Sequence, residues 1–165
     1  MIRIRPYGEE DDSQIVALIQ EVLDEYGIQE DVGQEPDLKD IPAYFDFSNG
    51  GGLWVLEDDG QVVGTIGLHK LSEDSCYFSR FYVKKEYRGQ GWGSKLWHHR
   101  AEYLKDLPYK KAYATSFHAF KDALEFYRTH GYEEIGKEDF PLETRWADKF
   151  FVKELAGLFA IERRF

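Results

Sequence analysis

The chain has 165 residues, of which 42% are hydrophobic, 16% aromatic and 32% charged. This length and composition are typical of a single folded domain, and they exclude an intrinsically disordered chain. Twenty-one Lys and Arg residues stand against 31 Asp and Glu, so the formal net charge is −10. Nucleic acids and anionic membranes bind clustered positive charge, and we therefore expect neither as a partner.

No hydrophobic run approaches the ~20 residues that a membrane-spanning helix needs. Met1–Pro6 also lacks the apolar core of a signal peptide. The single cysteine, Cys76, cannot form an internal disulfide. Together these observations predict a protein of the reducing cytoplasm, in which Cys76 is a buried thiol rather than a nucleophile.

In the first part of the chain, the spacing of apolar residues predicts a strand and two helices. Ile2 and Ile4 alternate with arginines, which indicates a short half-buried strand. Apolar residues recur at helical spacing over 15–26, and Gly27 follows as a helix stop. A second, shorter helix is expected over 38–45.

Three strands are expected next, followed by alternating helices and strands. Segments 53–56 and 61–68 flank Asp59-Gly60, a pair that suits the positive backbone φ angles of a tight hairpin. Segment 76–83 is rich in aromatic and β-branched residues, as strands are. The remaining expected elements are helix 92–107, strand 112–117, helix 122–130 and two strands at 132–135 and 149–155. Helix 92–107 should present Leu96, Trp97, Ala101 and Leu104 on one side.

This order of elements predicts an α/β (α+β) fold, with a mixed sheet of six to seven strands and about four helices on both faces. Hairpins come first and helical crossovers follow, so the sheet should contain both antiparallel and parallel pairs. No linker, repeat or low-complexity tract interrupts the chain. We therefore expect a single domain over 1–155, followed by a C-terminal tail at 156–165 with no assigned role.

The segment after strand 76–83 carries the clearest chemical signal. Three glycines alternate with other residues at the start of an amphipathic helix, in the run Arg88-Gly89-Gln90-Gly91-Trp92-Gly93-Ser94. Glycines let backbone N–H groups approach an anion closely, and the N-terminus of a helix adds partial positive charge. These features predict a pyrophosphate site, with a spacing that differs from the P-loop and the dinucleotide fingerprint.

The run Arg88-x-x-Gly91-x-Gly93, after a strand that ends in Phe81-Tyr82-Val83, resembles the acetyl-CoA motif of the GNAT N-acetyltransferase superfamily. A second run, 123–132, resembles the late helix–turn–strand motif of that family. The predicted order of elements is also similar to the family's fold. The resemblance therefore extends over nearly the whole chain, except the tail.

The resemblance implies a splayed sheet in which strands 76–83 and 112–117 run parallel and part to admit the pantetheine arm of acetyl-CoA. Main-chain groups of Phe81, Tyr82 and Val83 would pair with that arm. Acetyl-CoA would be the acyl-donor cosubstrate, and no metal is expected. Where the family has an aliphatic residue this chain has Trp92, which we expect to pack in the core. The residues implied to hold the pyrophosphate are Arg88, Gly89, Gln90, Gly91, Trp92, Gly93 and Ser94.

Acetyl transfer to an amine needs a neutral amine, a polarised carbonyl and a proton for the departing thiolate. An amine with the pKa of lysine is neutral in only roughly one molecule in 2,500 at pH 7. Tyr127 matches the tyrosine that acts as general acid toward the CoA sulfur in the family; its alternative role is a core aromatic. Main-chain N–H groups of the splayed strand would polarise the carbonyl.

The base that accepts the amine proton has several alternatives. Many relatives carry a glutamate near the position of Tyr77, but the segment 76–80 contains no carboxylate. An asparagine of the family is replaced by Phe120. A tyrosine hydroxyl could relay the proton through water. The candidates for a remote base are Glu25, His69 and His118.

The resemblance places the acceptor on the opposite side, along the first two helices and their loop. Aromatic rings beside carboxylates suit a small cationic amine there. The same pattern also fits a core hairpin with a solvated acidic loop. The aromatic residues are Tyr26, Tyr44, Phe45 and Phe47, and the carboxylates are Glu25, Glu30, Asp31, Glu35 and Asp37.

Two functions follow from the resemblance. The first is an N-acetyltransferase that moves an acetyl group from acetyl-CoA to a primary amine of a small molecule or protein. The alternative is a catalytically weak acyl-CoA-binding sensor or interaction module on the same fold. The missing strand carboxylate favours the alternative, and the retained Tyr127 favours catalysis. We expect acetyl-CoA and an amine acceptor as partners of a monomer or homodimer.

Overall fold

The computed structural model describes residues 1–144 and 147–155 of the chain. The expected C-terminal tail, 156–165, lies outside the described residues. The described residues divide into two compact units, one formed by Met1–His69 with Ser79–Leu107 and the other by Lys70–Phe78 with the described residues from Pro108 onward.

The first three strands of the first unit form antiparallel pairs. β1 pairs with β2, and β2 pairs with β3. The hairpin between β2 and β3 is confirmed, since Asp59 and Gly60 have φ angles of +47° and +87°. Both faces of β2 and β3 are largely buried, as expected where helices cover two sides of a sheet. The strands are β1 (Ile2–Pro6), β2 (Gly52–Asp58), β3 (Gln61–Lys70) and the second half of β4 (Ser75–Val83).

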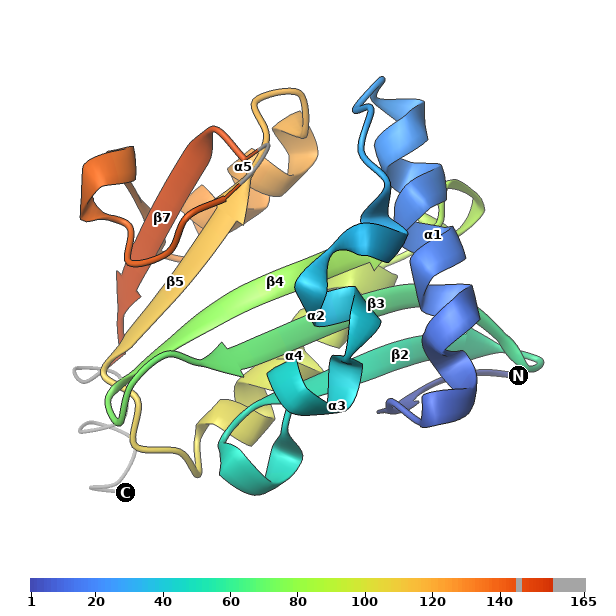
Figure 1. The fold of residues 1–165 in the computed structure, drawn as a ribbon, viewed down its shortest axis with the longest axis horizontal. Coiled ribbons are helices and arrows are strands. Elements are labelled where there is room, and N and C mark those ends of the chain that lie inside the picture. The colour runs from blue at the N-terminus through green and yellow to red at the C-terminus, as the bar shows by residue number, and fades with distance from the viewer. Residues whose placement is uncertain (145–146, 156–165) are drawn as a thin grey trace. The chain divides into compact units, whose positions relative to one another are not determined.

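Two long and two short helices accompany these strands: α1 (Asp12–Glu25), α2 (Pro36–Lys39), α3 (Ile41–Tyr44) and α4 (Trp92–Leu104). Figure 1 shows α1, α2 and α3 in front of the strands of this unit and α4 behind them. The inward face of α1 is the predicted one, because it buries Ile15, Leu18, Ile19, Val22 and Leu23.

The prediction of one helix over 38–45 is wrong, because this segment contains parts of two four-residue helices, α2 and α3. Asp40 separates them with φ −143° and ψ 69°, which is not a helical conformation. A continuous helix would place Pro42 in its interior, where proline lacks the N–H for the helical hydrogen bond and clashes with the carbonyl of Leu38. Pro42 instead lies in the first turn of α3, where that N–H is not needed.

The buried face of α4 also differs from the expected one. Leu96, Trp97 and Leu104 are buried as predicted, but Arg100 is buried with them in place of Ala101 and is only 1% exposed. Its guanidinium carbon lies 4.3 Å from the centroid of the Trp97 ring. This cation–π contact, together with the apolar stem of the side chain, lets an arginine occupy an apolar face.

The second unit contains the first half of β4, the strands β5 (Lys111–Ser116), β6 (Glu133–Ile135) and β7 (Lys149–Glu154), and the helix α5 (Lys121–Thr129). β4 pairs with β5 in parallel over Ser75–Phe78, as the resemblance implies. β7 runs antiparallel to both β5 and β6. The seven strands follow the order β1-β2-β3-β4-β5-β7-β6, which confirms the predicted mixed sheet.

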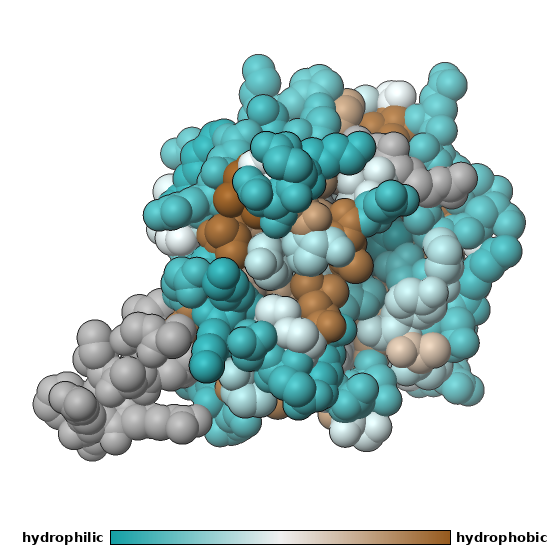
Figure 2. Space-filling view, turned by 60° about the vertical axis from the view of Figure 1, so that its left-hand side comes forward, coloured by the Kyte–Doolittle hydropathy of each residue, from teal (hydrophilic) through white to brown (hydrophobic). Residues whose placement is uncertain are grey.

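Hydrophilic residues cover most of the surface seen in Figure 2, with hydrophobic side chains in patches between them. No helix in the described part of the chain has the length and apolar character to cross a membrane. Cys76 is buried, as predicted for a structural thiol.

Candidate functional site

The glycine loop, residues 88–94, follows β4 after a short 3-10 turn at Lys85–Tyr87, and left-handed backbone residues give it its shape. Gly89 and Gly91 have φ angles of +74° and +85°, which glycine adopts without strain. A Cβ added at either position would meet no atom within 4 Å. These two glycines therefore face open space rather than a packed neighbour.

α4 begins directly after Gly91, which occupies its N-cap position. The N–H groups of the first helical turn have no acceptor within the helix, and the helix dipole places partial positive charge beside them. Open space, donors and positive charge together suit a diphosphate. The expectation that Trp92 packs in the core is wrong: it is half-buried, and the Lys95 ammonium lies 4.2 Å from its ring centroid.

Arg88 has an anchoring role that sequence reasoning missed. Its Nε donates to the carbonyl of Val83 at 2.7 Å. Its two terminal nitrogens donate to the two carboxylate oxygens of Glu25, the last residue of α1, at 2.9 and 3.0 Å. Arg88 therefore links the end of β4, the end of α1 and the start of the glycine loop.

Arg80, within β4, has an unusual backbone for a strand residue. Its φ is +52°, and Asp59 of the hairpin is the other non-glycine residue with positive φ among those described. Such a conformation costs a non-glycine residue about 1–3 kcal/mol and persists where surrounding contacts enforce it. The only sequence signal is that an arginine interrupts a strand rich in aromatic residues.

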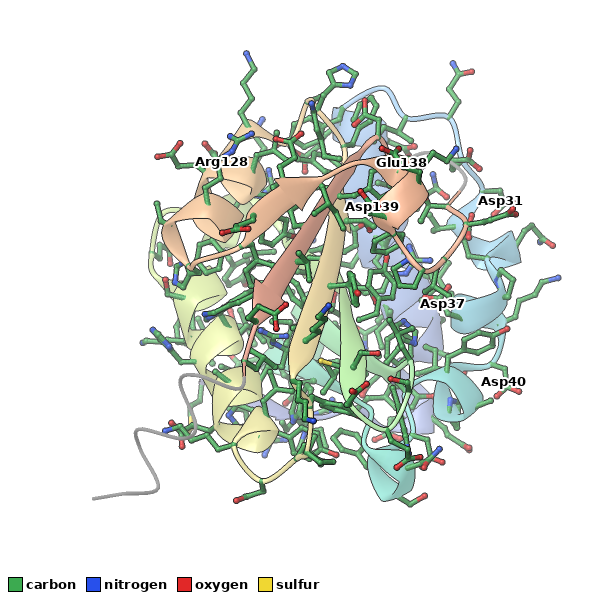
Figure 3. The ribbon with its side chains drawn as sticks, turned by 90° about the vertical axis from the view of Figure 1, so that its left-hand side faces the viewer. Asp31, Asp37, Asp40, Arg128, Glu138 and Asp139 are labelled. Atoms are coloured by element: carbon green, nitrogen blue, oxygen red, sulfur yellow. The ribbon has the colours of Figure 1, made fainter. Side chains whose placement is uncertain are left out.

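The contacts around Arg80 come from β3 and from the region of α2. Nε and Nη2 of Arg80 donate to the two oxygens of Asp37 at 2.8 and 2.7 Å, and a Glu35 oxygen lies 4.0 Å from Nη2. The Thr65 hydroxyl donates to the Arg80 carbonyl at 2.7 Å. In Figure 3, Asp31 and Asp40 lie at the outer edge of the segment around α2, whereas Asp37 lies further inside.

The aromatic residues expected to wall the acceptor site have different environments. Phe45 is buried in the core, whereas Tyr26, Tyr44 and Phe47 are exposed. Phe47 packs edge-on against Trp54, with ring centroids 5.2 Å apart. The acidic loop is likewise only partly solvated, because Asp37 and Glu35 face Arg80.

The three candidate bases have different partners. Both carboxylate oxygens of Glu25 bind Arg88. His69 Nδ1 lies 2.9 Å from the Tyr44 carbonyl, and burial lowers the pKa of this imidazole. In the second unit, Asp148 accepts the main-chain N–H of His118 and binds its Nδ1. This last arrangement orients an imidazole as carboxylates do in acid–base dyads.

The lowered pKa of His69 predicts a pH dependence of stability. Below pH ~6.5, where a histidine of the unfolded chain gains its proton, the unfolded state binds more protons than the folded state at this site. The free energy of unfolding should therefore fall on acidification, and His69→Gln should make this fall shallower between pH 7 and 5. Urea unfolding at several pH values measures the free energy of unfolding of the parent and of His69→Gln. The control is His98→Gln, because His98 lies at an exposed position of α4. An equal slope in parent and His69→Gln would contradict the prediction.

Tyr127 lies in the second unit, on α5, and is 4% exposed. Its ring packs edge-on against Phe78, with centroids 5.5 Å apart, and lies 5.4 Å from the ring of Phe151. Its carbonyl accepts the N–H of Tyr132 at 3.0 Å. Packing thus fixes the ring of Tyr127, which suits both a core aromatic and a precisely directed hydroxyl.

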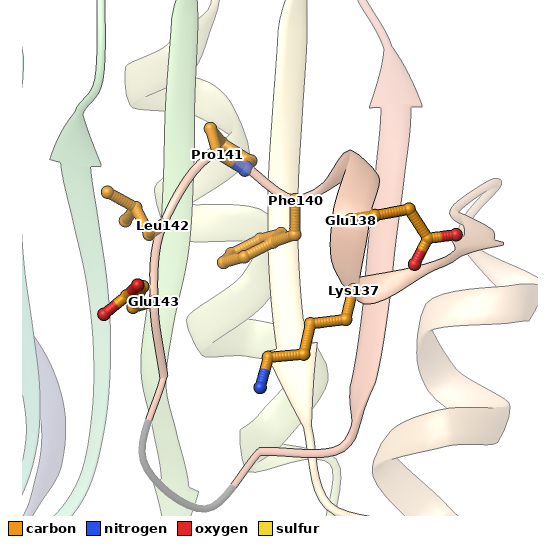
Figure 4. Close-up of a pocket in the computed structure, with 6 residues that line it drawn as sticks. All are labelled: Lys137, Glu138, Phe140, Pro141, Leu142 and Glu143. Carbon is orange, nitrogen blue, oxygen red and sulfur yellow. The ribbon is translucent and has the colours of Figure 1, made fainter.

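Tyr77 lies near the position where the resemblance implies a strand glutamate, and its hydroxyl lies 2.7 Å from the Thr115 hydroxyl. A hollow of about 450 Å³ also lies in the second unit. Figure 4 shows Phe140 in this hollow, between Lys137 and the Leu142–Glu143 segment. No residue implied by the resemblance lines it. Within the described residues, no group of three or more His, Cys, Asp or Glu side chains is placed to hold a metal.

Comparisons with known proteins give the chain a family. The model of the Acetyltransferase (GNAT) family matches residues 15–132. An uncharacterized N-acetyltransferase of Escherichia coli strain K12, YjgM, is 29% identical over 132 residues, which cover 76% of this chain and 78% of that protein. A GNAT-family acetyltransferase of Staphylococcus aureus Mu50 has a similar structure, with a TM-score of 0.85, 26% identity and coverage of 94% and 99% of the two chains.

A third relative shares the fold at lower sequence identity. The structure of a PaiA N-acetyltransferase from Thermoplasma acidophilum, determined in complex with coenzyme A, has a TM-score of 0.70 and 17% identity. The match covers 94% of this chain and 99% of that one. With the family model spanning most of the chain, the protein belongs to the GNAT acetyltransferase family and is an acyltransferase.

Proposed function

We propose that the protein transfers an acetyl group from acetyl-CoA to a primary amine of a small molecule or protein. The observation that carries this proposal is the glycine turn at the start of α4, where Gly89 and Gly91 face open space beside helix N–H groups. A diphosphate fits such a turn because backbone donors can approach it without a Cβ in the way. The Thermoplasma relative, which shares the fold, holds coenzyme A.

The proposed binding residues divide by the part of acetyl-CoA that they meet. Main-chain groups of 81–83 pair with the pantetheine arm, and those of 89–94 hold the diphosphate. The Arg88 side chain anchors the start of the glycine loop through its contacts with Val83 and Glu25. When bound, acetyl-CoA supplies an activated acyl group as a thioester.

The chain then contributes proton transfer and charge stabilisation. Main-chain N–H groups of β4 donate to the thioester carbonyl as negative charge develops on its oxygen. The Tyr127 hydroxyl donates its proton to the sulfur that leaves. His118, oriented by Asp148, and His69, whose pKa is lowered by burial, are the candidate imidazoles for accepting the amine proton.

We also propose that residues 1–155 act as one acetyltransferase domain in the cytoplasm, as a monomer or homodimer. The match to the family model runs from residue 15 to residue 132 and so includes parts of both compact units. A family domain that extends across both units supports their working together.

Release of free CoA thiol tests the proposed function directly. The purified chain would be mixed with acetyl-CoA and, in turn, with spermidine, tyramine, L-lysine and a lysine-containing peptide. Amine-dependent thiol release, with a product heavier by one acetyl group, supports the proposal. If CoA binds but no amine is acetylated, the result supports the alternative function of an acyl-CoA-binding sensor. The absence of a carboxylate over residues 76–80 is the observation that favours this alternative.

The Glu25–Arg88 contact predicts a moderate effect on CoA affinity. Glu25→Gln keeps the shape of the side chain but removes the charge that holds Arg88, so the glycine loop loses one anchor. We expect CoA to bind about fivefold more weakly, since a partly exposed ion pair contributes up to ~1 kcal/mol. Calorimetric titration with CoA measures this. Glu21→Gln is the control, because Glu21 lies on the same helix and, among the described residues, forms its ion pair with Lys84 at 3.9 Å. An equal effect of both variants would refute the prediction.

A further inference from the structure

The left-handed residue in β4 lies immediately before the segment whose main chain is proposed to bind the pantetheine arm of acetyl-CoA. In a regular strand, successive main-chain N–H groups point to opposite sides. A single residue with φ near +52°, as at Arg80, interrupts this alternation and redirects the N–H groups that follow. The residues that follow are 81–83.

Glycine is the residue that adopts this conformation without strain, yet the chain has arginine at this position. The conformation is held from two directions. Asp37 takes two charge-assisted hydrogen bonds from the side chain, and Thr65 donates to the carbonyl. The ion pair is largely removed from water, since the side chains of Arg80 and Asp37 are 10% and 14% exposed.

A buried ion pair is a poor way to gain stability, because both charges lose their hydration. The arrangement around Arg80 combines such a pair with a strained backbone. Strain that the surrounding structure enforces is concentrated at functional sites. This combination points to a role in setting backbone geometry rather than to stabilisation of the fold.

We propose that Asp37 and Arg80 are positioning residues for acetyl transfer. Asp37 holds Arg80 in its left-handed conformation, and that conformation aims main-chain N–H groups of 81–83 at the thioester carbonyl. This inference rests on the proposed function. It assigns a role in catalysis to a carboxylate of α2 that needs no contact with either substrate.

Two variants at position 80 separate the backbone from the side chain. Arg80→Gly removes the ion pair but permits the left-handed conformation at no steric cost, whereas Arg80→Ala removes the pair and disfavours that conformation. We expect kcat to fall about a hundredfold in Arg80→Ala, the effect typical of one lost oxyanion donor. Arg80→Gly should retain at least ten times the kcat of Arg80→Ala. The affinity for acetyl-CoA should fall far less than kcat in either variant, because the proposed diphosphate site is made by residues 89–94.

A second pair of variants tests the part of Asp37. Asp37→Asn should lower kcat strongly when residue 80 is arginine, because the strained backbone then loses the charged partner that holds the arginine side chain. The same change should have little effect in the Arg80→Gly background, because glycine adopts the left-handed conformation without that partner. This non-additivity isolates the coupling between the two residues. It also keeps the test available if Arg80→Ala fails to fold.

A spectroscopic readout needs no acceptor. Acetyl-CoA labelled with ¹³C at the thioester carbonyl would be bound to each variant and followed by isotope-edited infrared difference spectroscopy. The parent and Arg80→Gly should lower the carbonyl stretching frequency relative to free acetyl-CoA. Arg80→Ala and Asp37→Asn should lose much of this shift. Asp59→Ala is the control, since Asp59, in the β2–β3 hairpin, is the second non-glycine residue with positive φ among those described.

The outcomes distinguish this inference from the proposed function. If the parent binds no acetyl-CoA, the proposed function fails and the inference fails with it. If acetyl-CoA binds with the same carbonyl frequency in every variant, the inference alone is overturned. Equal losses of kcat in Arg80→Gly and Arg80→Ala would overturn it too, as would an equal effect of Asp37→Asn in both backgrounds.

Discussion

Replacing Gly91 with aspartate should weaken CoA binding by about a hundredfold or more. The new side chain would enter the open space beside the start of α4, where a Cβ meets no atom within 4 Å. Its carboxylate would then stand where the diphosphate is proposed to bind. Two unit charges about 4 Å apart repel by roughly 4 kcal/mol at the effective dielectric near a protein surface. Calorimetric titration with CoA measures the loss.

Gly60→Asp is the matched control for this experiment. Gly60 has φ +87°, close to the +85° of Gly91, and it also has no atom within 4 Å of an added Cβ. Both variants therefore carry the same backbone strain and the same added charge, but Gly60 lies in the β2–β3 hairpin. Thermal unfolding should shift similarly in both. Unchanged CoA affinity in a folded Gly91→Asp variant would remove the assignment of the loop.

Removing the hydroxyl of Tyr127 should lower kcat by about 10² to 10⁴, the contribution typical of general acid catalysis. Tyr127→Phe keeps the ring and its packing against Phe78 and Phe151, so the free energy of unfolding should change little. CoA affinity should stay within about threefold of the parent, because the proposed phosphate site is made by the glycine loop. Steady-state kinetics with an amine that the parent accepts would measure kcat, and calorimetry the affinity.

Tyr132→Phe is the control for Tyr127→Phe. Tyr132 is also buried in the second unit, and its ring centroid lies 6.0 Å from that of Tyr127. Loss of its hydroxyl should leave kcat close to that of the parent. If both variants turn over normally, Tyr127 is a core aromatic and has no part in proton transfer.

Most helices and strands could be predicted because they follow local periodicity. The apolar spacing of α1 and the Asp59-Gly60 hairpin each need information from only a few neighbouring residues. The apolar spacing over 38–45 predicts one helix, but spacing alone takes no account of Pro42, which begins a separate helix. The burial of Arg100 depends on stacking against Trp97, and hydrophobic spacing carries no signal for that contact.

The candidate site could be predicted only where its chemistry is local. Glycines alternating before a helix predict left-handed turns and an open anion site, and Gly89 and Gly91 have those conformations. The pairs Glu25–Arg88 and Asp37–Arg80 join residues 63 and 43 positions apart. Among 31 acidic residues, nothing local indicates which carboxylate meets which arginine.

The single cysteine provides a built-in reporter. Cys76 is 0% exposed, within the segment of β4 that pairs with β5. A thiol reagent can reach it only when this part of the sheet opens, so its rate of alkylation measures the free energy of that local opening. The same burial helps an assay that detects thiols with a chromogenic disulfide. In the folded protein Cys76 is shielded from the reagent, so the colour reports the thiol of released CoA and not that of the enzyme. Comparing alkylation with and without CoA would then show how far the ligand stabilises the strand pair.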